Sequence, residues 1–532
     1  MNQNTEHDPR YAGRSADWSR NDVSLLAERS TPSRRPWPQR AARVPDRSDV
    51  SVKTSLLRRP WFRQAWLVLG ALLAFAAHFR PWEVAFLEEW PLAEYWVDRG
   101  PIAFAAHYFG WSLSRPLHLL PTELGLAVAG GAPGGIFLVL GLVASAQFLL
   151  TLWAIRSLSR AFWIGGAVAL FIALHPLWPG GFLQRFLPAQ AAALAMIIAA
   201  GLLIRWLQYG RIRWIATAAI TMMVGLSIYP GPAVAAPLLA VALALAVEAP
   251  WRRRVVAVVA MTAASALMTV YSLVVTRLID PRGGTYEAGN FTEATTAGPR
   301  QALATLGTTL NSHGFVILAG VVAITALGAL LALIGAIPHR AGWLMSGAAA
   351  ISPLCAIVYF GNVSWLQDID RLGYATSLGL IAALLVPPIT SLGGRPRAEA
   401  VIAVLLTILS LVGAARGIQH WQPYVQLQHR LLAELAPVVR EAKGDEIVVV
   451  VDHSGTYGSE YTLPQHYVNS ASHVMNEDRT EVWLCSLATD PPLDGAVLCD
   501  PKDTGVGLRL VTSFRVPHGD VDIYIGQPES SG

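Results

Sequence analysis

The strongest constraint on this chain is a series of apolar runs, each about 17 to 23 residues long, between Trp61 and Arg416. A run of that length lets an α-helix cross a hydrocarbon core of about 30 Å. In hydrocarbon, only helices and closed barrels satisfy all their backbone hydrogen bonds. The composition fits this class, because 53% of the residues are hydrophobic and only 14% are charged. The runs therefore predict an α-helical polytopic membrane protein.

The apolar runs predict about eleven transmembrane helices. The stretches 102–130 and 299–313 are interrupted by polar residues and prolines, so we expect them to lie as helices in the membrane interface. The predicted spans are 62–79, 135–155, 161–178, 187–207, 213–229, 233–249, 254–276, 314–336, 341–360, 373–392 and 398–416.

Arginine placement predicts the orientation of the spans. Basic residues occur in alternate short loops, and the positive-inside rule assigns these loops to the cytoplasm. With an odd number of spans, the N-terminus is cytoplasmic and everything after Arg416 is outside the cytoplasmic membrane. The loop residues are Arg156, Arg160, Arg205, Arg211, Arg213, Arg252, Arg253, Arg254, Arg340, Arg395 and Arg397.

Three regions follow from these patterns. Residues 1–58 are basic and lack periodic apolar positions, so they predict a disordered cytoplasmic tail that rests on anionic lipid. Residues 59–418 form the transmembrane domain, with a first outside loop at 80–134. Residues 419–532 predict a compact extracytoplasmic α+β domain. No folded basic face with interleaved aromatic residues is evident, so nucleic-acid binding is not expected.

The C-terminal region carries its own secondary-structure signals. Residues 420–440 predict a helix, and EIVVVVD at 446–452 predicts a buried strand. Cys485 and Cys499 flank a proline-rich and glycine-containing turn in an oxidising compartment, which predicts a disulfide. Two buried, unpaired cysteines are the alternative. Cys355 lies in a span and should remain a thiol.

The first outside loop concentrates ionisable and aromatic residues beside the membrane. Carboxylates are costly near hydrocarbon, so the cluster is a candidate functional site. The alternative is a set of solvated acids beside an aromatic interfacial belt. The acids are Glu83, Glu88, Glu89, Glu94 and Asp98, and the aromatic residues are Trp82, Trp90, Tyr95 and Trp96.

The sequence Leu87-Glu88-Glu89-Trp90, followed by Ser114-Arg115-Pro116-Leu117-His118, resembles the polytopic GT-C glycosyltransferases. The resemblance covers roughly residues 60 to 420. It implies a GT-C-like fold, a catalytic carboxylate at Glu88 or Glu89, and a polyprenyl-phosphate sugar as donor. This chain has Glu-Glu where an aspartate is frequent in the family, which leaves a divalent cation requirement open. No histidine or cysteine spacing predicts a metal site.

Sugar transfer also has physical requirements that the residues meet. A carboxylate in a partly desolvated pocket can take the proton of an acceptor hydroxyl. The phosphate leaving group needs cations, and an arginine can bind it through two hydrogen bonds. The outside-facing candidates are Arg115, Arg185 and Arg371. Arg371 has an alternative role in a surface ion pair with Asp368 or Asp370.

Further residues complete the predicted substrate site. Trp90 and Tyr95 are assigned to sugar stacking, with membrane anchoring as their alternative. His118 and Asp98 are assigned to substrate binding, although such a histidine is often a hydrogen-bonded structural group.

The leading hypothesis is an inverting glycosyltransferase that transfers a sugar from a lipid-linked donor to an envelope glycan, lipid or protein. A transporter or flippase of lipid-linked saccharide is the first alternative, and it would favour charged or broken spans at the bilayer midplane. A non-catalytic envelope assembly factor is the second alternative, and it would tolerate the loss of both Glu88 and Glu89.

Overall fold

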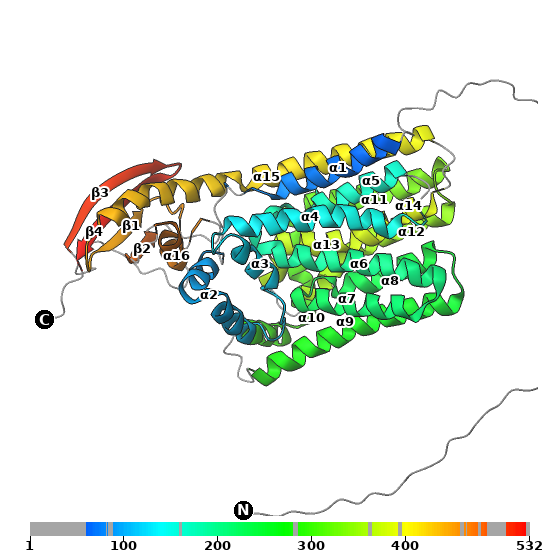
Figure 1. Cartoon of the computed structure of the whole chain (residues 1–532), viewed down its shortest axis with the longest axis horizontal. Helices are drawn as coiled ribbons and strands as arrows, with labels where there is room; N and C mark the ends of the chain where they lie inside the picture. Colours follow the sequence, from blue (N-terminus) through cyan, green and yellow to red (C-terminus); the bar gives the residue numbers. More distant parts are fainter. Residues whose placement is uncertain are drawn as a thin grey trace, which may run out of the picture. The chain divides into compact units, whose positions relative to one another are not determined.

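The structure is a computed structural model of the chain. It describes residues 60–80, 82, 89–158, 162–279, 286–359, 364–391, 396–457, 462–463, 465–476, 480–486 and 507–527. In these residues the chain is mostly helical and ends in a small sheet, as Figure 1 shows. The predicted tail 1–58, Glu88 and Cys499 lie outside the described residues.

Each predicted span coincides with a described helix. The helices are α1 (Pro60–His78), α4 (Gly134–Ile155), α5 (Phe162–Leu174), α6 (Leu187–Tyr209), α7 (Ile212–Ile228), α8 (Pro232–Ala246), α9 (Trp251–Ile279), α11 (Phe315–Leu333), α12 (His339–Ile351), α13 (Ile369–Leu384), α14 (Val386–Thr390) and α15 (Pro396–Glu441). Short 3-10 helices are η2 (Pro179–Phe182), η3 (Gln184–Phe186), η4 (Ser352–Tyr359) and η5 (Ser364–Leu366).

Seven helical stretches in the described part of the chain are long and apolar enough to cross a membrane. They comprise α4, η3 with α6, α9, α11, α12 with η4, α13 with α14, and α15. Helices α5, α7 and α8 are apolar but shorter. The structure thus supports an α-helical membrane protein, and the total of about eleven crossings stays a prediction.

Helix α13 is the innermost helix of the bundle. All its residues except Ile369 and Arg371 are buried, whereas α9 exposes most of its residues. Small residues let neighbouring helices approach closely, which is the usual basis of helix packing in membranes. At Gly342 of α12, for example, an added Cβ would lie 2.5 Å from the Cβ of Ala332 on α11. The residues at the start of α13 are therefore positioned by helices on all sides.

The same Gly-Pro sequence kinks the chain just before, or at the start of, each of the two stretches predicted to lie in the interface. Helix α2 (Glu89–Trp111) has a non-helical Gly100 with φ 78° before Pro101, and α10 (Tyr286–His313) has Gly298 with φ 72° before Pro299. Proline disfavours the helical conformation in the preceding residue, and only glycine adopts positive φ at little cost. A short helix, α3 (Leu120–Val128), completes the predicted stretch 102–130.

The C-terminal region contains a four-stranded sheet with the order β2-β1-β4-β3. Strand β1 pairs in parallel with β2 and antiparallel with β4, and β3 with β4 forms a hairpin. The predicted strand at 446–452 is β1, and all its residues are buried. The remaining bounds are β1 (Ile447–Asp452), α16 (Gln465–Asn476), β2 (Val482–Ser486), β3 (Gly507–Val516) and β4 (Gly519–Gln527).

Both faces of β1 are covered, which explains its unbroken apolar sequence. Val448 and Val450 pack with residues of α15 and α16, while Val449 and Val451 pack on the other face. Side chains alternate between the faces of a strand, so a strand covered on both sides needs apolar residues throughout.

Helix α15 joins the bundle to the sheet without a break. The sequence predicts a span at 398–416 and a separate helix at 420–440, but the structure has one helix of 46 residues. No helix-breaking residue separates the two predicted segments. At Gly417 an added Cβ would lie 2.7 Å from the ring of Phe182, so a packed glycine rather than a linker stands at this junction.

Cysteine placement follows the predictions where the structure describes it. Cys355 is a buried free cysteine in η4. Cys485 is buried on β2. Because Cys499 lies outside the described residues, the disulfide between Cys485 and Cys499 stays a prediction.

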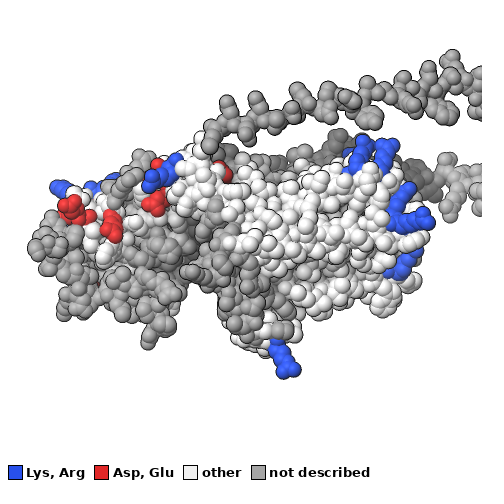
Figure 2. Space-filling model, turned by 90° about the horizontal axis from the view of Figure 1, so that it is seen from below, with Lys and Arg blue, Asp and Glu red and all other residues white. Residues whose placement is uncertain are grey.

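Charged side chains are segregated along the molecule. Figure 2 shows a broad zone without charged described residues between a group of basic side chains at one end and a mixed acidic and basic group at the other. Arginines stand at or next to the neighbouring ends of α4, α7, α9 and α12. An uncharged zone flanked by charge is the pattern expected for a membrane-embedded protein.

Reporter fusions test the predicted orientation. A fusion after Arg254, before α9, and one after Lys443, beyond α15, should lie on opposite sides of the membrane. The alternating arginines predict a cytoplasmic position for the first and an outside position for the second. Alkaline phosphatase activity and green-fluorescent-protein fluorescence report the two compartments. The same compartment for both fusions would contradict the predicted topology.

Candidate functional site

A tight turn between α5 and α6, residues 175–186, is fastened by side chains from three distant parts of the chain. The backbone N–H of Gly180 donates a 2.9 Å hydrogen bond to Oδ1 of Asp370 at the start of α13. The carbonyls of η2 accept hydrogen bonds from the Trp421 indole of α15, at 3.0 Å, and from Arg80 after α1. Buried backbone groups need such partners. The turn therefore joins the region after α1, the start of α13 and the middle of α15.

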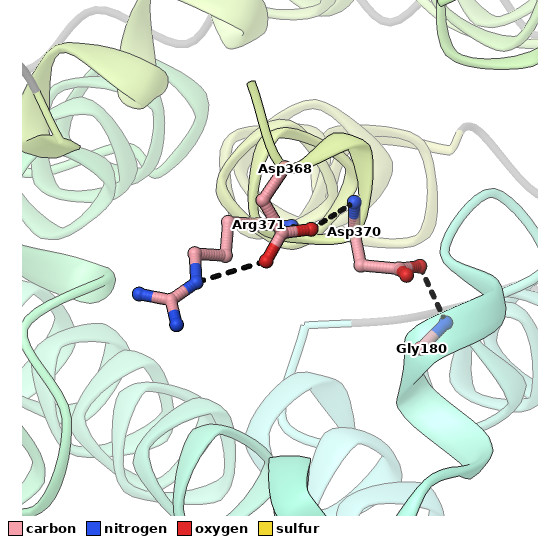
Figure 3. A network of polar contacts seen from close by, with 4 residues as sticks. All are labelled: Gly180, Asp368, Asp370 and Arg371. Atoms are coloured by element: carbon pink, nitrogen blue, oxygen red, sulfur yellow. Dashed lines mark hydrogen bonds and ion pairs between the residues drawn. The ribbon is translucent and has the colours of Figure 1, made fainter. Parts of the chain in front are cut away.

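The start of α13 carries two carboxylates with different partners, as Figure 3 shows. Asp368 caps the helix: its Oδ1 accepts hydrogen bonds from the backbone N–H groups of Asp370, at 2.9 Å, and Arg371, at 3.3 Å. Asp370 points the other way, toward Gly180. Of these two carboxylates, Asp368 is the one that pairs with Arg371, through a 3.0 Å hydrogen bond from Nε to Oδ2.

Arg371 is a partly buried arginine whose guanidinium is only partly used by the described residues. Its side chain is 14% exposed, which is too little for the ordinary surface pair that the sequence left open. The guanidinium lies 4.2 Å from the ring centroid of Trp365. Its two terminal nitrogens point away from Asp368 in Figure 3 and donate no hydrogen bond to any residue that the structure describes. Guanidinium N–H groups lacking a protein acceptor require water or an anion.

Aromatic rings connect Arg371 with the turn and with the SRPLH segment. Tyr229, at the end of α7, is within electrostatic reach of Arg371, as are Tyr359 and Arg185. The ring of Tyr229 lies 6.1 Å from that of His118 and 5.4 Å from that of Tyr374. We call these rings, together with that of Trp365, the aromatic wall beside Arg371.

The SRPLH segment, residues 114–118, is held in place by two helices. Its Leu117 N–H donates to the carbonyl of Ser227 at 3.1 Å, next to the end of α7. The Ser272 hydroxyl of α9 donates to the carbonyl of Ser114 at 2.8 Å. The segment is thus a fixed wall of the site.

His118 is a neutral imidazole in this environment. Burial, with a smaller effect of the Arg115 charge, lowers the pKa of His118 to about 3. Its Nδ1 lies 2.9 Å from the carbonyl oxygen of Ile228, which can only accept. Nδ1 therefore carries the proton, and Nε2 is left as an acceptor. Such a group can accept a hydrogen bond or a proton from a substrate hydroxyl.

The structure brings the four predicted basic groups together. Arg371 acts electrostatically on His118, Arg115 also acts on His118, and Arg185 acts on Arg371. They come from three separate places in the sequence, because Arg115 and His118 both belong to the SRPLH segment. The sequence identified Arg115, Arg185 and Arg371 as outside-facing cations and His118 as part of the SRPLH motif, and their association is a property of the fold.

The acidic part of the first outside loop has a different setting. Glu89 is buried at the first position of α2, and Trp90, 1% exposed, packs in the core formed by α15, α16 and the sheet. A ring enclosed in this way has no open face for a sugar. Tyr95 stacks on His107 across the Gly100 kink, with ring centroids 4.6 Å apart. Glu88 lies outside the described residues.

Asp98 lies at the interface between α2 and α16 rather than in the aromatic wall beside Arg371. Its Oδ1 is 3.7 Å from Nε2 of His473 on α16. The sequence assigned Asp98 to substrate binding. The structure places a histidine of the C-terminal region beside it.

Sequence reasoning missed the aromatic residues of the site. Tyr229 begins a Tyr-Pro-Gly-Pro turn that received no chemical role. At Gly231 in this turn an added Cβ would lie 2.2 Å from the ring of Tyr374. Glycine therefore permits the close approach of the turn to α13. The sequence signal that could have identified Tyr229 was an aromatic residue beside a proline-rich turn at the end of an apolar run.

Comparison of the chain with models of known protein families found no match, and comparison with curated proteins found none either. Its function is therefore inferred from the residues and their geometry.

A Gly180→Ala substitution tests the importance of the turn. The new Cβ would lie 2.9 Å from Oδ1 of Asp370 and 2.8 Å from Nε1 of Trp178, so we expect a loss of about 1–3 kcal/mol in stability. Gly347→Ala in α12 is the matched control, because nothing lies within 4 Å of its added Cβ. Thermal unfolding in detergent measures both. Equal unfolding temperatures for the two variants would contradict the structural role of the turn.

Proposed function

We propose that this protein is a membrane glycosyltransferase that binds a polyprenyl-phosphate sugar outside the cytoplasmic membrane and transfers the sugar to an envelope acceptor. The observation that carries the proposal is the partly buried guanidinium of Arg371, whose terminal nitrogens have no acceptor among the described residues. The resemblance to the GT-C glycosyltransferases indicates the reaction class, and the guanidinium favours a substrate that carries a phosphate.

A phosphate fits the site by charge and by hydrogen-bonding geometry. A guanidinium donates two parallel hydrogen bonds to two phosphate oxygens, whereas a lysine acts as a point charge. Asp368 uses Nε of Arg371 and thereby fixes the direction of the remaining donors. Arg185 adds a second positive charge within electrostatic reach. The partly buried setting strengthens such interactions relative to water.

The surroundings favour a lipid-borne phosphate. Arg371 lies in the first turn of α13, which is buried among apolar helices. A phosphate on a polyprenyl chain can enter such a site from the membrane, with its chain remaining in hydrocarbon. A soluble sugar nucleotide would gain nothing from this placement.

The proposed reaction is inverting transfer. An acceptor hydroxyl attacks the anomeric carbon, the bond from that carbon to the phosphate oxygen breaks, and the bonding electrons leave with polyprenyl phosphate. The phosphate gains one negative charge, which Arg371 is placed to stabilise. A base takes the hydroxyl proton. Glu88 and Glu89 are our candidates for this base, and the neutral Nε2 of His118 is the alternative.

A flippase would share phosphate recognition but not chemistry. It would move a lipid-linked saccharide across the membrane and leave the sugar bond intact. The gathering of basic groups at one end of the bundle, rather than along the spans, favours a single-sided reaction. An assay that follows both cleavage and translocation separates the two functions.

Substitution of Arg371 by lysine tests phosphate recognition. Arg371→Lys keeps the positive charge but loses the paired N–H donors of the guanidinium. We therefore expect binding of polyprenyl phosphate to weaken by about 10-fold or more, which corresponds to the loss of a charged hydrogen bond of about 1.5–3 kcal/mol. Arg340→Lys is the control, because Arg340 pairs with Glu248 at an exposed position. Binding is measured with polyprenyl phosphate, and the neutral polyprenol reports the contribution of the chain. Unchanged affinity for the phosphate in Arg371→Lys would reject the site.

Amide substitution of the acidic pair tests the base. Glu88→Gln or Glu89→Gln keeps the side-chain shape and removes basicity, so the variant of the catalytic residue should lose about 10²–10⁴-fold in transfer rate. Donor binding should remain, because the phosphate site is separate. Sugar release from a radiolabelled lipid donor measures the rate. Full activity in both variants and in the double variant would transfer the proposed role to another group, with His118→Ala as the next test.

A further inference from the structure

The interface between α2 and α16 brings together three potential metal ligands. Glu94 and Asp98 are four residues apart on α2, so they share one helix face. His473 comes from α16, which packs against α2. One donor atom of each of the three side chains can be chosen so that all lie within 4.8 Å of one another. The cluster combines an imidazole with two carboxylates from distant parts of the sequence.

The orientation of His473 is fixed through one ring nitrogen. Nδ1 lies 2.8 Å from Oε1 of Glu94, and the other carboxylate oxygen of Glu94 accepts a hydrogen bond from the Ser470 hydroxyl. Ser470 and His473 are three residues apart on the same face of α16. Nδ1 therefore carries a proton for Glu94, and the ring is held in one direction.

The second ring nitrogen faces another carboxylate. Nε2 of His473 lies 3.7 Å from Oδ1 of Asp98. A protonated Nε2 would form a charge-assisted hydrogen bond of about 2.7–2.9 Å to a carboxylate. An unprotonated Nε2 would direct its lone pair at a negative charge. A cation bound between Nε2 and Oδ1 would attract both the lone pair of the ring nitrogen and the carboxylate. It would also fit their separation, because two ligand atoms that each lie about 2.0–2.2 Å from a zinc ion are somewhat over 3 Å apart.

From this geometry we propose a binding site for a divalent transition-metal cation of the Zn²⁺ type. Asp98 and Nε2 of His473 bind the ion directly, water completes its coordination, and Glu94 orients the imidazole. A histidine ligand held by a carboxylate through its other nitrogen is the usual arrangement at such sites. The imidazole favours Zn²⁺ over Mg²⁺, which prefers oxygen ligands.

The accessibility of the cluster suits an exchangeable ion. The side chains of His473, Glu94 and Asp98 are 16%, 26% and 27% exposed, so the ring is largely enclosed while both carboxylates keep some access to solvent. The ion would link the helix of the first outside loop to the helix that covers the sheet. This inference concerns metal binding and holds whether or not the chain transfers sugar.

The test uses the full chain in detergent, purified without a histidine tag and stripped with a chelator. Zn²⁺ is titrated in competition with a chromophoric chelator, and bound metal is counted by mass spectrometry. We expect one Zn²⁺ per chain, a weaker response to Mg²⁺, and a loss of at least 10-fold in affinity in Asp98→Asn and His473→Ala. Glu94→Gln should lose about 10- to 100-fold, as for other outer-shell partners.

Two further variants separate metal binding from packing. His473→Asn retains a donor for Glu94 in place of Nδ1 and lacks Nε2, so it should elute and unfold like the native chain but bind no Zn²⁺ at this site. His453→Ala is the matched control, because His453 pairs with Asp522 at 3.1 Å in the same domain but belongs to no three-ligand cluster among the described residues. Its Zn²⁺ affinity should be unchanged. Absence of Zn²⁺ binding in the wild type, or equal binding in the wild type and His473→Asn, would overturn the proposal.

Discussion

The hydrogen bond from the Gly180 N–H to Asp370 is the contact on which the arrangement of the site depends. It ties the turn between α5 and α6 to the start of α13 and directs Asp370 away from the neighbouring arginine. Asp368 alone then pairs with Arg371 and occupies only Nε. If Asp370 had paired with Arg371 as well, its carboxylate would have neutralised the terminal nitrogens. The availability of the guanidinium thus follows from the position of one backbone N–H.

The distribution of polar groups divides the described structure into two chemical environments. At the start of α13, cations lie among aromatic rings, which suits an anionic ligand. At the contact of α2 with α16, carboxylates and an imidazole lie together, which suits a cation. Both places are formed by side chains from helices that are far apart in the sequence. Each of these sites therefore exists only in the folded protein and is not a property of any one segment.

Sequence reasoning located the helices and most of the polar residues of the site. Apolar runs fix helices because hydrocarbon leaves the backbone no other partner, and charge at their ends is costly enough to stand out. The sequence could not show that Arg371 and His118 meet, because the pattern of one helix does not specify its neighbours. Trp90 was misjudged for the same reason: an aromatic residue beside a membrane has the same sequence signature whether it faces a sugar or a protein core.

The length of the continuous helix α15 determines how far the sheet lies from the start of that helix. Its 46 residues span about 69 Å at 1.5 Å per residue. A hydrocarbon core takes up about 30 Å of that length, so more than half of the helix stands clear of the lipid tails. The sheet at its far end is carried by this continuous helix, which includes Pro423 and Pro437, and not by a separate linker. In the predicted orientation, the length of α15 would therefore set how far the sheet stands from the membrane surface.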